Sequence, residues 1–291
     1  MFEKQKGQTL IYQIFSRKDI SRSFLPVQEG SPLFNTLKYV EKCTRDLLDM
    51  HHKNLSLVTK DELTLKGVFI PNESNKCYVG LHDAFTNGVR ELSGEALYFY
   101  ELGYNVFIPY SRAHGPSEGL FVTYGEIAAD DLRKWLSFLK DEKGMNSFVL
   151  HGIGLGANTI SFILKEKEFN FDVAICDSPE VSAKRIIDNW VDLRFPMNKK
   201  QNLIKEYAYK TYKELFICDV ENTIFSLNIN ESNYPVLLLT HSLDEEKDYG
   251  EIDNKLITKK NINNSSHSLA FYNNDNYIRI IKEFVSINGK E

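Results

Sequence analysis

Cysteine is scarce in this chain of 291 residues, and the few cysteines lie far apart. Cys43, Cys77, Cys176 and Cys218 form no C-x-x-C pair. This spacing argues against a disulfide framework and against a zinc site. It fits a reducing compartment, so we expect a cytoplasmic protein that holds no metal and no cofactor.

Positive charge is not in excess either, because 35 Lys and Arg stand against 40 Asp and Glu, a net charge of −5. A nucleic-acid partner usually requires a basic face or domain, and we expect none. No stretch approaches the roughly 18 apolar residues of a membrane span. The first residues are polar and lack the apolar region of a signal peptide. We therefore expect no association with membranes.

Short apolar runs recur along the chain and predict the strands of a buried sheet. A hairpin is indicated first, at residues 55–59 and 63–70. The later runs are continuous rather than alternating, which is typical of strands buried on both faces of a parallel sheet. They are residues 77–81, 106–109, 148–150, 173–176 and 236–239.

The segments between these runs are helical in period. In residues 126–140, for example, Leu132, Leu136 and Leu139 fall on one face. Alternating strands and helices predict an α/β fold with a doubly wound, mostly parallel sheet. We expect a peripheral helical extension over residues 1–53, a sheet domain over 54–291, and a helical cap inserted at about 178–233.

The turn after the run at 148–150 carries the chemistry, and two interpretations fit it. The residues from Gly152 to Ala157 satisfy the G-x-G-x-x-G/A pattern of dinucleotide binding, with Asp177 after the next strand as the ribose acid. The same residues fit a nucleophile elbow, G-x-S-x-G, with Gly154 at its centre. Small residues on both sides of that centre allow the sharp strand-to-helix turn of an elbow.

Four other segments resemble the α/β-hydrolase superfamily, and among its members the uncharacterised bacterial hydrolases related to serine esterases and thioesterases. Residues 80–87 stand where that family has its oxyanion loop, and residues 111–119 are like its R-x-H-G-x-S-x-G turn. Residues 235–244 look like the strand and turn that carry the catalytic acid. Residues 266–268 contain a histidine just before the last helix, as in the family. The resemblance runs from about residue 60 to the end of the chain.

The resemblance implies the α/β-hydrolase fold and assigns roles to particular residues. It places the nucleophile at Gly154, the acid at Asp244 and the base at His267, in the chain order that this fold uses. It makes the backbone N–H groups of Ala84 and Leu155 the oxyanion hole. In a working site of this kind, the histidine takes the nucleophile's proton and the acid orients the imidazole.

The sequence departs from the family pattern in three places. Gly154 has no side chain, so no acyl-enzyme forms through it, and loss of a triad serine typically costs about a millionfold in turnover. Asp83 replaces a glycine of the oxyanion loop, where its charge opposes the charge to be stabilised; alternatively, it points outward and caps the following helix. The stretch between Asp244 and His267 is short for the helix and edge strand expected in it.

Three hypotheses for the function follow. The first is a protein related to carboxylic-ester hydrolases that is catalytically impaired and binds a small acyl or ester-like ligand, or a protein. The second is an active carboxylesterase or thioesterase whose serine at position 154 was replaced for crystallisation. The third is a dinucleotide-binding protein that uses the glycines from Gly152 to Ala157.

Overall fold

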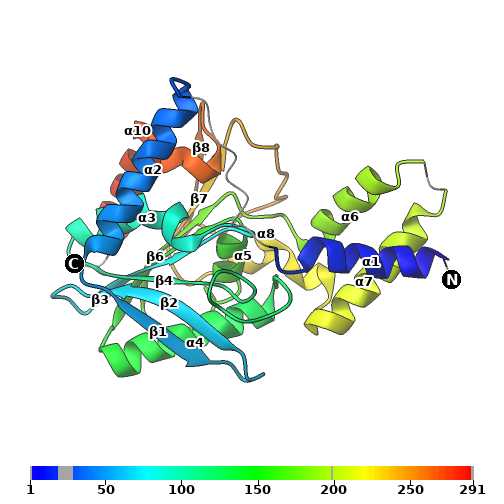
Figure 1. Ribbon diagram of the computed structural model, residues 1–291, viewed down its shortest axis with the longest axis horizontal. Helices are drawn as coiled ribbons and strands as arrows, with labels where there is room; N and C mark the ends of the chain where they lie inside the picture. Colours follow the sequence, from blue (N-terminus) through cyan, green and yellow to red (C-terminus); the bar gives the residue numbers. More distant parts are fainter. Residues whose placement is uncertain (1, 19–28, 198, 290–291) are drawn as a thin grey trace.

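A single sheet runs through the chain in the computed structural model, which describes residues 2–18, 29–197 and 199–289. Its eight strands follow the order β1-β2-β4-β3-β5-β6-β7-β8 (Figure 1). β2 is antiparallel to both of its neighbours, and every pair from β4 to β8 is parallel. The prediction of a mostly parallel sheet is confirmed. The strands are β1 (Lys53–Val58), β2 (Thr64–Ile70), β3 (Lys76–Leu81), β4 (Asn105–Pro109), β5 (Ser147–Ile153), β6 (Phe171–Asp177), β7 (Val236–His241) and β8 (Ile257–Ile262).

Helices cover both faces of this sheet, as the doubly wound prediction requires. α4 (Glu126–Lys143), α5 (Leu155–Ser161) and α8 (Phe225–Asn230) bury their apolar side chains against one face. α3 (Gly88–Glu101) and α10 (Asp275–Asn288) cover the other. Successive side chains of a strand point to opposite faces, so in β3 Cys77 and Val79 join the first core and Tyr78 the second.

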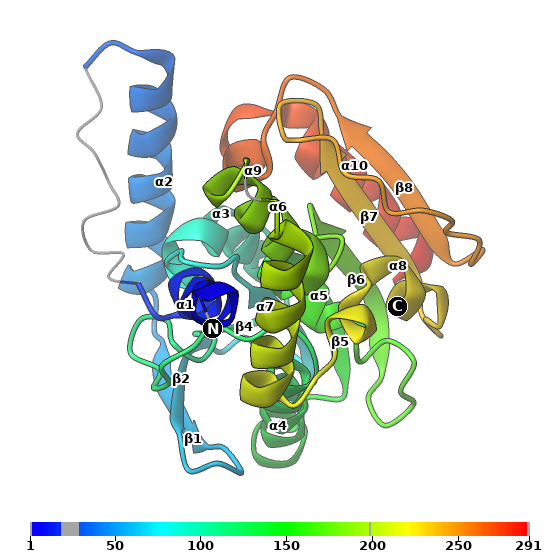
Figure 2. The ribbon, with the colours of Figure 1, turned by 90° about the vertical axis from the view of Figure 1, so that its right-hand side faces the viewer.

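The N-terminal region divides between two parts of the molecule. α1 (Phe2–Phe15) packs along α7 (Gln201–Phe216), beside α6 (Ala183–Arg194), away from the sheet (Figures 1 and 2). α2 (Pro32–Asp49) packs against α3 instead. Leu10 and Ile11 of α1 are buried. The apolar face of α1 completes the cluster formed by α6 and α7.

The chain between β7 and β8 contains no helix, although all of residues 242–256 are described. This corrects the expectation of a helix beside the edge strand. The stretch is polar and has no apolar stripe, and Gly250 takes a left-handed conformation with φ of 67°. Tyr249 anchors it, because its hydroxyl donates to the carbonyl of Pro179 at 2.7 Å.

The carboxyl ends of the parallel strands meet at one edge of the sheet, where open α/β sheets place their ligands. The loops after β3, β5 and β7 all begin there. Short elements complete the chain: η2 (Val220–Thr223) precedes α8, and η3 (His267–Leu269) and α9 (Ala270–Asn273) lead into α10. No helix within the described ranges is long and apolar enough to cross a membrane.

Candidate active site

Gly154 lies at the sharp turn between β5 and α5, with φ of 50° and ψ of −109°. Its two flanking glycines are required by close packing. A Cβ on Gly152 would lie 2.3 Å from the carbonyl carbon of Gly156, and a Cβ on Gly156 would lie 2.2 Å from the oxygen of Leu81. The local geometry is that of a strand-to-helix elbow, and β5 is a central strand of the sheet.

Asp177 does not serve the dinucleotide interpretation. Its carboxylate lies 2.7 Å from Nε2 of His241, and both side chains are completely buried. A ribose-binding acid must reach a ligand at the sheet edge, and this one is enclosed in the sheet. The structure therefore contradicts the dinucleotide hypothesis.

His267 and Asp244 lie in contact despite the short stretch of chain between them. Nδ1 of His267 is 2.8 Å from Oδ2 of Asp244, and the backbone N–H of His267 donates to the same oxygen at 3.3 Å. The Ser178 hydroxyl also donates to it, at 3.1 Å. These three contacts fix the carboxylate and hold the imidazole with its Nε2 edge turned toward Asp83.

Asp83 points into the site. Its Oδ1 accepts hydrogen bonds from the N–H of Leu155 at 2.8 Å and of Ala84 at 2.7 Å. We call these two N–H groups the cradle; they are the pair to which the resemblance assigns the oxyanion hole. The side chain that caps α3 is Asn87, which accepts from the N–H of Arg90. The alternative in which Asp83 caps that helix is therefore wrong.

The Asp83 carboxylate also occupies the space of the missing side chain at position 154. A Cβ built on Gly154 would lie 1.9 Å from Oδ1, 2.2 Å from Cγ and 2.8 Å from Oδ2 of Asp83. Real Cβ atoms essentially never approach other atoms so closely. A serine at 154 and this arrangement of Asp83 exclude each other, so the two departures from the family pattern are coupled in space.

Two carboxylates face the imidazole of His267 from opposite ring nitrogens. Nε2 lies 3.6 Å from Oδ2 of Asp83, while Nδ1 contacts Asp244. Burial opposes a charged imidazole, but the two carboxylates prevail and raise the pKa of His267 to about 10. In return, the imidazole lowers the pKa of Asp83 and of Asp244 against the effect of burial. At neutral pH the site thus holds one imidazolium between two carboxylates.

Neighbouring residues hold the Asp83 backbone in place. Glu91 accepts the N–H of Asp83 at 2.8 Å, and burial together with the Asp83 charge raises the pKa of Glu91 to about 7. Burial lowers the pKa of His82, so this ring is neutral. It bonds the carbonyl of Asp83 through Nδ1 and accepts the N–H of Ser111 through Nε2. No local motif in the sequence marked Glu91 or Ser178.

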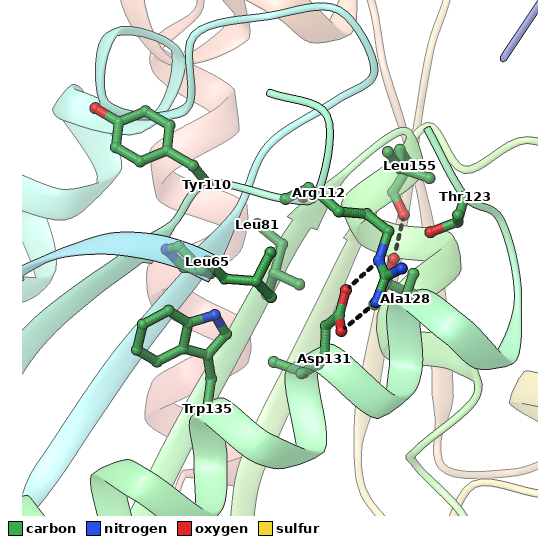
Figure 3. A pocket seen from close by; sticks show the side chains of 13 residues that line it. Leu65, Leu81, Tyr110, Arg112, Thr123, Ala128, Asp131, Trp135 and Leu155 are labelled. Atoms are coloured by element: carbon green, nitrogen blue, oxygen red, sulfur yellow. Dashed lines mark hydrogen bonds and ion pairs between the residues drawn. The ribbon is translucent and has the colours of Figure 1, made fainter. Parts of the chain in front are cut away.

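A small pocket lies beneath the elbow, and the two charged residues that line it pair with each other (Figure 3). The guanidinium of Arg112 holds both oxygens of Asp131, at 2.7 and 2.8 Å. The Leu155 side chain lines this pocket while its N–H belongs to the cradle. Asp83 and His267 do not line it, so the pocket is a structural feature behind the site.

Two larger hollows adjoin the site itself. A polar cleft of about 330 Å³ is lined by Asp244 and Ser178. A mostly apolar groove of about 350 Å³ runs between α2 and the site loops, with Phe85 and Leu269 on its wall. The side chains of Asp83 and His267 are 24% and 26% exposed, so both are within reach of a small molecule.

Solved structures of other proteins share this fold, as comparison with known proteins shows. No protein-family model matches the chain. A segment of 97 residues, 33% of this chain, is 33% identical to an uncharacterized protein of Bacillus subtilis, YqkD, and spans only 32% of that protein's length. The esterase Pf2001 of Pyrococcus furiosus has a TM-score of 0.63 at 20% identity, over 84% of this chain and 94% of that one. An alpha-beta hydrolase from Vibrio vulnificus has a TM-score of 0.59 at 15% identity, over 93% and 99%. Such identities show a shared fold alone.

Proposed function

We propose that this chain, which has the α/β-hydrolase fold, does not hydrolyse carboxylic esters through residue 154. Instead, it binds a small molecule at the site formed by Gly154, Asp83 and His267. The observation that carries the proposal is the position of the Asp83 carboxylate. It fills the cradle and the space of a nucleophile side chain at once. Acyl transfer requires both places to be free.

The occupied cradle also limits which ligand groups can bind at this site. An acyl or ester-like ligand would have to bring its carbonyl oxygen to the N–H groups of Ala84 and Leu155, which already donate to Asp83. The proposed ligand therefore meets Oδ2 of Asp83 and the His267 ring, not the cradle. A protein partner and the cytoplasmic location expected from the sequence stay predictions.

The proposal is distinguished from an ester hydrolase with a replaced serine by restoring the serine. We expect Gly154→Ser alone to remain inactive on 4-nitrophenyl acetate, because Asp83 still fills the space that the serine needs. Gly154→Ser combined with Asp83→Gly should raise His267-dependent hydrolysis at least about a hundredfold, since one oxyanion donor alone is typically worth 10²–10³. Only the double variant should react with a fluorophosphonate probe.

The matched control is Glu142→Gln, which removes an exposed carboxylate at the end of α4, outside the site. Circular dichroism of each variant checks that it folds. Hydrolysis of 4-nitrophenyl acetate by the unaltered chain that disappears in His267→Gln would contradict the proposal. Full activity of Gly154→Ser alone would instead support the replaced-serine hypothesis.

A further inference from the structure

We propose that the outer end of the three-helix cluster of α1, α6 and α7 binds the surface of a membrane that contains anionic phospholipid. The inference goes beyond the proposed function, because it concerns a surface away from Gly154 and Asp83. It replaces the expectation of no membrane association, which was drawn from the lack of long apolar segments. A contact with the membrane surface needs no such segment.

Three helix ends meet at this surface. α1 and α7 begin at it and α6 ends at it, on the side of the molecule farthest from the sheet (Figures 1 and 2). Nζ of Lys200 lies 3.2 Å from Oε1 of Glu3 and so joins the start of α7 to that of α1. Nζ of Lys6 lies over the rings of Phe2 and Phe195, at 4.8 and 5.1 Å from their centroids. We call this surface the cap tip; it comprises residues 2–6, 190–197 and 199–206.

Large apolar side chains are exposed together at the cap tip. Leu193 is 77% exposed, Met197 is 92% exposed and Phe2 is 68% exposed. Trp190 and Leu203 are exposed to a smaller extent. Trp190 and Leu193 are three residues apart on α6, so they share one side of that helix. Apolar side chains that gather in one place, rather than being scattered singly, mark an interaction surface.

The cap tip is basic, although the chain as a whole is acidic. It contains six Lys and Arg and three Asp and Glu, a net charge of +3, whereas the whole chain carries −5. Lys4, Arg194 and Lys199 are exposed, and no carboxylate within the described ranges forms an ion pair with any of them. These three cations are therefore available to the phosphate groups of lipids.

This combination of side chains fits an anionic bilayer. Apolar side chains enter the boundary between headgroups and acyl chains, while Lys and Arg are attracted to the anionic lipids. Tryptophan is enriched at the same boundary. A second copy of the chain fits less well, because it would bring two surfaces of charge +3 together. The cap tip also projects from the sheet domain, so it can meet a flat surface before the rest of the molecule does (Figure 1).

Trp190 provides the readout of the test. The chain has two tryptophans, and the other, Trp135, is buried in the core. We would mix the full chain with vesicles made of equal parts phosphatidylcholine and phosphatidylglycerol. We expect the chain to sediment with these vesicles and its tryptophan emission to shift to the blue, because the Trp190 ring leaves water. Binding should be at least about tenfold weaker to phosphatidylcholine vesicles and in high salt, since several cations act on the anionic surface.

Two pairs of substitutions separate the apolar and the basic parts of the cap tip. Leu193→Asp combined with Met197→Asp should weaken binding to the anionic vesicles at least about tenfold, because it removes the side chains that enter the bilayer. Arg194→Glu combined with Lys199→Glu should weaken it by a similar factor through charge reversal. All four positions are exposed, so circular dichroism should be unchanged.

Matched controls place the same changes elsewhere. Ile287→Asp replaces a side chain of α10 that is 79% exposed. Lys259→Glu combined with Lys260→Glu reverses two exposed charges on β8. Both should bind the anionic vesicles as the unaltered chain does, because charges farther from the bilayer than a Debye length of about 10 Å are screened.

Several results would overturn the inference. They are no sedimentation with the anionic vesicles, equal binding to phosphatidylcholine vesicles, full binding by either tip variant, and binding without a shift of the emission. A dimer that Leu193→Asp with Met197→Asp converts to a monomer, seen by size-exclusion chromatography with light scattering, would assign the surface to a second copy instead. None of these results bears on the proposed function, which is tested by ester hydrolysis.

Discussion

At the scale of single residues, the roles of Gly154 and Asp83 depend on each other, because the two residues share one space. A glycine at the centre of an elbow leaves no side chain to act as nucleophile. A carboxylate in an oxyanion loop repels the negative charge that this loop would stabilise on a reacting oxygen. In space, the carboxylate fills the room that the glycine leaves and takes the two N–H donors. Each substitution accommodates the other, because a side chain at 154 would collide with Asp83.

This coupling can be measured as free energy of unfolding. Gly154→Ala should destabilise the chain by about 2 kcal/mol, because alanine at a φ of 50° is strained and its Cβ meets Asp83. In an Asp83→Gly background the same change should cost roughly 1 kcal/mol less, since the collision is gone. Urea unfolding of the four chains of this cycle gives both values. Equal costs in the two backgrounds would show that the residues are independent.

At the scale of elements, α1 and α7 pack backbone to backbone at one glycine. A Cβ on Gly7 would lie 2.7 Å from the oxygen of Ile204 and 2.8 Å from the nitrogen of Ala208. This close approach lets Leu10 and Phe15 of α1 reach the cluster formed with α6 and α7. The packing, rather than helix propensity, explains a glycine inside α1.

Gly7→Ala tests that explanation, because helix propensity and packing predict changes of opposite sign in the free energy of unfolding. Alanine in a free helix would add about 1 kcal/mol of stability over glycine. Overpacking of a close contact typically costs 1–3 kcal/mol, so we expect a net loss of about 1 kcal/mol. Thr9→Ala, at an exposed position of the same helix, is the control and should be neutral or slightly stabilising. A gain in stability from Gly7→Ala, read from thermal unfolding, would refute the close packing.

At the scale of the whole molecule, segments from three parts of the chain bring together one imidazolium and two carboxylates. The loop after β3 carries Asp83, the loop after β7 carries Asp244, and η3 begins at His267. The imidazolium lowers the free-energy cost of burying each carboxylate, and the carboxylates lower the cost of burying the imidazolium. Folding is therefore linked to pH through this site.

The direction of the linkage follows from the pKa values. His267 in the folded chain binds its proton up to a pKa of about 10, whereas an unfolded histidine releases it near pH 6.5. The stabilisation from His267 is complete below pH 6.5 and is lost as pH rises toward 10. Asp83 and Asp244 have lowered pKa values, so their contribution is present above an unfolded pKa of about 4 and is lost in more acidic solution.

We expect the free energy of unfolding to fall by at least about 1 kcal/mol more between pH 6.5 and 9.5 in the unaltered chain than in His267→Gln. Urea titrations at the two pH values measure it. The variant lacks the imidazole but retains both carboxylates, so it isolates the proton on His267. An identical fall in both chains would mean that this proton does not contribute to stability.

The sequence by itself determined the order of strands and helices and the positions of the site residues along the chain. Continuous apolar runs report burial on both faces, and that burial is a property of each segment. The elbow glycines and the order of residue 154, Asp244 and His267 were likewise readable, because they are local patterns in a fixed order. The structure confirmed the sheet and brought these residues together.

Only the tertiary structure decided which way Asp83 points, since the same residue could cap α3 or enter the cradle. Its direction depends on Leu155 and His267, which lie 72 and 184 positions away and are fixed by other strands. The same holds for α1, whose partner α7 is distant in sequence, and for Glu91, which no motif marks. Contacts between distant segments leave no periodic signal in the chain. The paired state of Asp83 and Gly154 therefore became visible only when the loops after β3 and β5 were placed side by side.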